Sequence, residues 1–110
     1  YEESFYISTR FSSFLEIGKN RSQKTLENYR HYLRRFTDFL PDDISPKDLN
    51  LNIIQDFRLF LNRLQPTLSI KTQHYHLVAI RSFLKYLQKH DIETLSAEKI
   101  DLPKIPDRIV

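Results

Sequence analysis

One pattern of residues occurs twice in the chain, 47 positions apart, and it restricts the folds that the chain can adopt. The copies are SQKTLENYRHYLRRFTDFL, residues 22–40, and SIKTQHYHLVAIRSFLKYL, residues 69–87. In each copy, apolar residues recur three and four positions apart, which places them on one face of an α-helix. Two copies are too few for a solenoid, which needs about three or more repeats to bury its faces. We therefore predict two helical hairpins packed together, each ending in a basic helix.

The apolar positions of the two copies define the expected core. They are Leu26, Tyr29, Leu33, Phe36 and Leu40 in the first copy, and Leu77, Ile80, Phe83, Leu84 and Leu87 in the second. Phe36 and Phe83 occupy matching positions, so we expect both to be buried. The opposite side of the second helix, which includes His76 and Ala79, is expected to be exposed.

Two further helices complete the expected fold. The first covers residues 4–17 and ends at Gly18, the only glycine, which suits a left-handed C-terminal cap. Asn52 and Gln55 are spaced as a capping box for another helix, which ends before Pro66. The sequence thus predicts an all-α fold, a four-helix orthogonal bundle of two helical hairpins.

The last part of the chain lacks helical periodicity. Residues 92–110 contain Pro103 and Pro106 and are expected to form an extended strap that leaves a helical domain of residues 1–91. Because the chain starts without methionine and stops within a pattern, we interpret it as a fragment of a larger protein whose next domain follows the strap.

Composition excludes several classes of protein. The 110 residues are 40% hydrophobic and include no cysteine, which is enough for one core without disulfides. No run of about 18 apolar residues and no signal peptide is present, so we expect a cytoplasmic protein without membrane contact. A single glycine cannot build a glycine-rich phosphate loop, and no acid pair or nucleophile with its base is apparent. We expect neither a cofactor nor an enzyme in this fragment.

Positive charge is concentrated in the two repeated helices. The net charge is only +3, but residues 19–35 hold six Lys or Arg against one acid, Glu27. Residues 69–90 hold Lys71, Arg81, Lys85 and Lys89 and no acid. This distribution indicates an anionic partner.

Each repeated helix begins with the same residues, which we call the SxKT turns. They are Ser22, Lys24 and Thr25, preceded by Arg21, in the first, and Ser69, Lys71 and Thr72 in the second. A serine N-cap is ordinary, but a lysine in the first turn opposes the helix dipole by roughly 0.3–1 kcal/mol. Free N–H groups, a hydroxyl and an ammonium together suit a phosphate. The alternative is two capped helices with solvated lysines.

Side chains one turn further along can reach DNA bases. Asn28 follows Thr25, and Tyr75 follows Thr72, three positions later on the same helix face. The major groove of DNA is wide enough for a helix, so these side chains would meet base edges or the sugar-phosphate backbone if the helices lie against it. The alternative is that they are ordinary surface residues. A metal site is not expected, because His74 and His76 are two positions apart and point to different sides of a helix.

These motifs resemble those of one family. The two repeated stretches, together with LPKIPDR at residues 102–108, resemble the N-terminal core-binding domain, SAM-like in fold, of tyrosine recombinases of the Xer and phage-integrase type. The resemblance implies one half of a C-shaped clamp around DNA, with the second and fourth helices crossing the major groove. It implies that a catalytic domain, which cuts DNA through a 3′-phosphotyrosine bond, follows the strap.

The resemblance also assigns DNA contacts by position. They are Lys24, Thr25 and Asn28 in the first copy and Lys71, Thr72, Tyr75 and His76 in the second. Arg81 matches a residue common in the family, with phosphate and a neighbouring subunit both open as its partner. We expect double-stranded DNA and other recombinase protomers as partners. Two alternatives are a helical protein-interaction module with a basic face and an RNA-binding helical domain.

Overall fold

The fold of the chain is all α-helical over the residues that the structure, a computed structural model, describes, namely 7–17 and 22–102. The four α-helices are α1 (Ile7–Ile17), α2 (Gln23–Phe39), α3 (Leu51–Asn62) and α4 (Ile70–Lys89). Two short 3₁₀ helices, η2 (Pro46–Asp48) and η3 (Ala97–Lys99), lie in the connections, and no strand occurs in the described ranges. The predicted all-α, four-helix class is confirmed.

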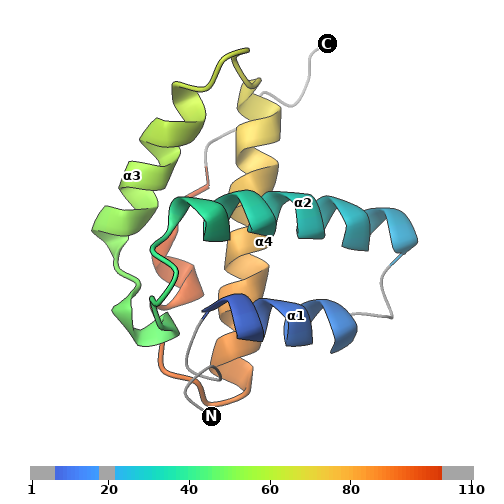
Figure 1. The fold of residues 1–110 in the computed structure, drawn as a ribbon, viewed down its shortest axis with the longest axis vertical. Coiled ribbons are helices and arrows are strands. Elements are labelled where there is room, and N and C mark those ends of the chain that lie inside the picture. The colour runs from blue at the N-terminus through green and yellow to red at the C-terminus, as the bar shows by residue number, and fades with distance from the viewer. Residues whose placement is uncertain (1–6, 18–21, 103–110) are drawn as a thin grey trace.

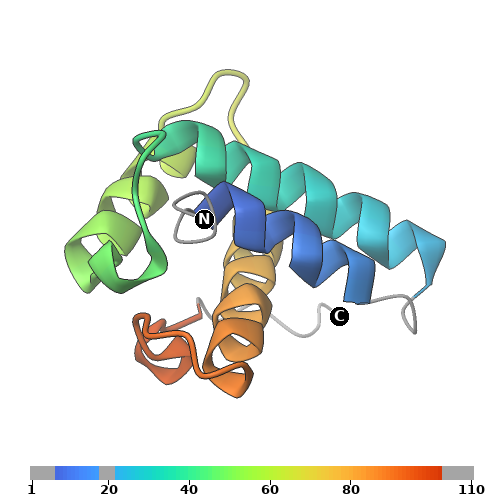
Figure 2. The ribbon, with the colours of Figure 1, turned by 60° about the horizontal axis from the view of Figure 1, so that its bottom comes forward.

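The helices pack as two hairpins that cross (Figure 1). α1 lies antiparallel beside α2, as both ribbon views show (Figures 1 and 2). α2 passes over the middle of α4 and packs mainly on it. α3 runs antiparallel to α4 on the other side of the bundle. The N-terminal ends of α2 and α4 therefore lie at different ends of a cross.

The predicted apolar faces meet in one core. Phe36 and Phe83 are fully buried, and their rings contact helices of the opposite hairpin. The centroid of Phe36 lies 4.9 Å from that of Phe57 on α3, and that of Phe83 lies 5.5 Å from that of Phe14 on α1. The remaining predicted core residues are buried or half-buried against the same cluster. Aromatic rings thus join each basic helix to the first helix of the other hairpin.

One predicted helix start differs from the observed one, and another falls partly outside the described residues. The N-cap of α3 is Asn50, whose Oδ1 accepts a hydrogen bond from Ile53 N at 3.0 Å, so the predicted capping box of Asn52 and Gln55 is wrong. Asn50 is the N-cap because α3 already begins at Leu51, so Asn52 lies within the first turn. The helix predicted to start at residue 4 is described from Ile7, and residues 4–6 and Gly18 lie outside the described residues.

Part of the expected strap packs against the bundle. The Ala97 N–H donates to Gln88 Oε1 at 2.9 Å, and Arg81 Nε donates to the Ala97 carbonyl at 3.2 Å. Arg58 Nη2 of α3 also donates to the carbonyl of Asp101. Ile100 is buried in the core. Residues 92–102 are therefore joined to α3 and α4, and residues 103–110 lie outside the described part.

Candidate nucleic-acid interface

The two SxKT turns have the same geometry. Ser22 and Ser69 are both extended N-caps, with φ/ψ of −64/156° and −67/159°. In each turn the serine Oγ accepts a hydrogen bond from the threonine N–H three residues later, at 3.1 Å. Each serine hydroxyl also donates to that threonine Oγ1, at 2.9 Å in α2 and 3.1 Å in α4. The predicted caps are confirmed in both copies.

This geometry determines which protons the turns can offer. Because each serine hydroxyl is used within its turn, its proton is directed at the threonine oxygen. The threonine hydroxyl keeps its own proton to donate elsewhere. The first N–H groups of an α-helix have no partner inside the helix, and the dipole adds partial positive charge there. With Lys24 and Lys71 exposed, each turn can donate several hydrogen bonds to one anion.

Other predicted contact residues differ in exposure. Asn28 is exposed one turn along α2, and Tyr75 on α4 is 42% exposed. Arg81 is half-buried, and its Nε is held by the Ala97 carbonyl, so this residue has a partner within the chain. Arg21 lies outside the described residues. The accessible predicted residues are thus confined to the N-terminal halves of the two basic helices.

The predicted exposure of His76 is wrong. The residue is 0% exposed, and Ala79 on the same side of α4 is also fully buried. This side of α4 is covered where α2 crosses it, and the Tyr32 ring lies 4.4 Å from the His76 ring. His76 Nδ1 lies 2.8 Å from the Thr72 carbonyl, and Arg35 Nη1 lies 3.3 Å from His76 Nε2. His76 is a core residue with two polar partners.

The surroundings of His76 favour its neutral form. Burial lowers the pKa of His76, and the hydrogen bond to the Thr72 carbonyl opposes that shift. Coulomb interactions with Arg35 and His31 lower the pKa of His76 further. A neutral imidazole has one N–H donor and one acceptor nitrogen, which matches the two partners observed.

The polar contacts between α2 and α4 are reciprocal with respect to the repeat. Aligning the copies matches Tyr29 with His76 and Arg35 with Ser82. The structure pairs Tyr29 Oη with Ser82 Oγ at 3.5 Å and His76 Nε2 with Arg35 Nη1 at 3.3 Å. The contact from position 29 of α2 to position 82 of α4 therefore has its equivalent in the contact from position 76 of α4 to position 35 of α2. Contacts related by a twofold axis are reciprocal in the same way. α2 and α4 cross as near-equivalent elements.

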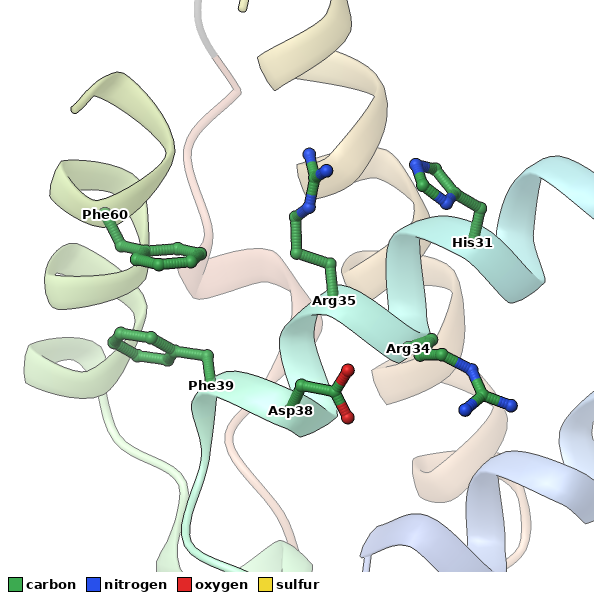
Figure 3. A pocket seen from close by; sticks show the side chains of 6 residues that line it. All are labelled: His31, Arg34, Arg35, Asp38, Phe39 and Phe60. Carbon is green, nitrogen blue, oxygen red and sulfur yellow. The ribbon is translucent and has the colours of Figure 1, made fainter. Parts of the chain in front are cut away.

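The sequence analysis did not include His31 and Arg35 of α2 among the candidate site residues. Lys24, Asn28, His31 and Arg35 are spaced by four, three and four positions, which places them on one face of the helix. Figure 3 shows His31 and Arg35 on the same side of α2, whereas Arg34 points away from them. The spacing itself was the available signal. We call these four residues the α2 stripe.

The far end of the α2 stripe borders a cavity between α2 and α3. It has a volume of about 610 Å³. Its lining consists of His31, Arg34, Arg35, Asp38, Phe39 and Phe60 (Figure 3). Phe39 and Phe60 lie side by side at one edge of this cavity, and the guanidinium groups of Arg34 and Arg35 point in different directions (Figure 3).

Residues 7–17 and 22–102 contain neither a metal site nor a membrane-spanning helix. No group of three His, Cys, Asp or Glu side chains there is placed to hold a metal ion. No helix in these ranges has the length and apolarity needed to cross a membrane.

Comparison with known proteins gives matches to one family. Residues 9–100 match the phage integrase N-terminal SAM-like domain. The tyrosine recombinase XerC of Oceanobacillus iheyensis is 33% identical over 101 residues, which cover 90% of this chain and 32% of that protein. The chain thus spans about a third of the length of this relative. No solved structure gives a significant match.

Proposed function

The chain belongs to the family of phage integrase N-terminal SAM-like domains, and from this membership we propose that it binds duplex DNA at a recombination half-site through α2 and α4. The observation that carries the proposal is the pair of SxKT turns with the same cap geometry. A lysine in a first helical turn is locally unfavourable, and it occurs at the same place in both copies. A bound phosphate at each turn accounts for both lysines.

The two turns would act at separate points of the DNA backbone. Because α2 and α4 cross and their N-terminal ends lie at different ends of the cross, each turn meets its own phosphate (Figure 1). Free N–H groups, the lysine ammonium and the threonine hydroxyl would donate to the phosphate oxygens. Such contacts set affinity and orientation and carry no sequence information directly.

Sequence preference would come from side chains one turn further along. Asn28 is exposed on the α2 stripe, and an asparagine can pair with adenine through two hydrogen bonds in the major groove. Tyr75 is exposed on α4 and offers a hydroxyl and a ring face to a base edge. These two residues are the candidates for base contacts.

The domain would position a recombinase protomer, with the chemistry carried elsewhere in the parent protein. The relative is named a tyrosine recombinase, and the matched region covers 32% of its length. We place the catalytic domain and the contacts with other protomers outside the region described here. The interdomain strap would remain residues 92–110, with residues 92–102 held against α3 and α4.

A salt titration tests the proposal. If the domain neutralises roughly four to six phosphates, the logarithm of its DNA association constant should fall with the logarithm of salt at a slope of about −3.6 to −5.4. Fluorescence anisotropy with a mixed-sequence DNA duplex measures the slope, and an RNA duplex of the same sequence tests the RNA alternative. Absence of DNA binding even at low salt would contradict the proposal and favour a protein partner.

A further inference from the structure

The contact between Arg35 and His76 has a defined direction. A guanidinium can only donate hydrogen bonds, so His76 Nε2 accepts from Arg35 Nη1 across 3.3 Å. The proton of the ring then sits on Nδ1 and is donated to the Thr72 carbonyl at 2.8 Å. A single buried imidazole therefore connects the α2 stripe to Thr72 of the SxKT turn on α4.

The chemistry of the acceptor matters for the charge of Arg35. A carboxylate at position 76 would bind the guanidinium more strongly but would also neutralise it. A neutral imidazole holds the guanidinium and leaves its positive charge available. Asp38 lines the same cavity and lies three positions after Arg35 on α2, which is ion-pair spacing. His76 gives Arg35 an uncharged hydrogen-bond partner instead of that carboxylate.

We propose that Arg35 is a further phosphate contact on α2, and that His76 is the positioning residue that holds its guanidinium in the cavity without neutralising it. The inference rests on the proposed DNA-binding function. It extends that function to Arg35, which the family resemblance did not assign, and gives His76 a positioning role in place of the direct DNA contact that the resemblance implied. Arg35 is half-buried and ends the α2 stripe, so a DNA backbone that follows the stripe from Lys24 reaches it last. The contact between Arg35 and His76 joins the stripe to α4, and the hydrogen bond from His76 to the Thr72 carbonyl holds the imidazole on α4.

Arginine variants test the phosphate contact. Arg35→Ala should weaken binding of a mixed-sequence DNA duplex by about tenfold, and should reduce the salt slope by about 0.9, the value for one phosphate. Arg34→Ala is the matched control, because it removes the same charge from the neighbouring position, which points away from Arg35 (Figure 3). The decrease in the logarithm of the DNA association constant should be less than half as large for Arg34→Ala as for Arg35→Ala. Equal losses for both variants would reduce the effect to net charge and overturn the proposal.

Histidine variants test the positioning role. His76→Leu fills the buried position with an apolar side chain and removes the Nε2 acceptor of Arg35. It should weaken DNA binding about three- to tenfold. His76→Gln retains a donor and an acceptor and should bind within about twofold of the wild type. In the Arg35→Ala background, His76→Leu should have no further effect on affinity. A merely structural histidine would give the same loss in both backgrounds, which would overturn the positioning role.

The outcomes separate this inference from the proposed function. If the wild-type domain binds no DNA, both fail. If it binds DNA and loses affinity on substitution of Lys24 or Lys71, but Arg35→Ala and His76→Leu bind normally, the proposed function stands and the inference is wrong. Thermal melts of each variant identify any that fail to fold, and for those the Arg35→Ala and Arg34→Ala pair decides.

Discussion

The first and second copies of the repeat are alike at their N-terminal ends and different where they cross. Both SxKT turns have the same cap, with a 3.1 Å bond from the threonine N–H to the serine Oγ. At the crossing, one reciprocal contact joins two hydroxyls, Tyr29 and Ser82, and the other joins a histidine and an arginine, His76 and Arg35. The likeness lies at the solvent-facing ends, and the difference lies at the buried crossing.

This difference separates two kinds of constraint. Caps require particular side chains at fixed spacing, so the same residues recur wherever the same turn is built. Where two helices cross, the facing side chains need only be complementary in shape and volume, so different residue pairs can occupy equivalent positions. As a result, the first copy has Arg35 held by a buried imidazole, whereas the second copy has Ser82 at the matching position. The two basic helices are thus equal as helix ends but unequal as binding surfaces.

Substitution of the matched core phenylalanines is expected to have the largest effect on the fold. Phe36→Ala and Phe83→Ala should each lower the free energy of unfolding by about 3–5 kcal/mol, because both rings are fully buried and contact an aromatic ring of the other hairpin. Chemical denaturation measures both. Exposed Leu59→Ala, on α3, is the control and should cost far less. A large loss for only one phenylalanine would break the equivalence of the two copies in the core.

A smaller effect should distinguish the two copies by pH. The folded state lowers the pKa of His76 below its ordinary value of 6.5, so the unfolded chain binds more protons between the two values. The stability contributed by neutral His76 is therefore fully present above about pH 6.5 and is lost as the pH falls through the lowered folded pKa. The matching residue of the first copy is Tyr29, so the two copies differ in side-chain chemistry at this position.

Comparison of His76→Gln with the wild type measures that term. Denaturation midpoints between pH 5 and 8 should fall less steeply on the acid side in the variant, because glutamine does not titrate. His90→Gln serves as the control, since His90 is an exposed histidine at the C-terminal cap of α4 and should leave the acid side of the profile unchanged. Identical pH profiles for the wild type and His76→Gln would show that the crossing contributes no pH dependence.

The sequence predicted the parts of this molecule that depend on local spacing. The apolar stripes identified Phe36 and Phe83 as core residues, and serine followed by threonine three positions later identified both caps. It failed where a second element decides. His76 lies on the face of α4 away from the main apolar stripe, and it is buried because Tyr32 of α2 and Phe57 of α3 pack against its ring. Ala97 is buried through contacts with α4 that no periodicity indicates.

The double variant Lys24→Glu/Lys71→Glu tests the central claim most directly, namely that the two SxKT turns bind DNA phosphates. Its fold should be as stable as the wild type or slightly more so, because an acid in the first turn agrees with the helix dipole. Lys47→Glu/Lys99→Glu, at two exposed lysines in η2 and η3, changes the net charge by the same amount and is the matched control.

The test measures the affinity of each variant for a mixed-sequence DNA duplex at low salt, together with its melting temperature. We predict that Lys24→Glu/Lys71→Glu loses more than about a hundredfold in affinity, since like charge would face phosphate at both helix ends, while its melting temperature does not fall. The control should lose far less. Normal DNA binding by the SxKT double variant, or an equal loss in the control, would contradict the assignment of these turns to DNA.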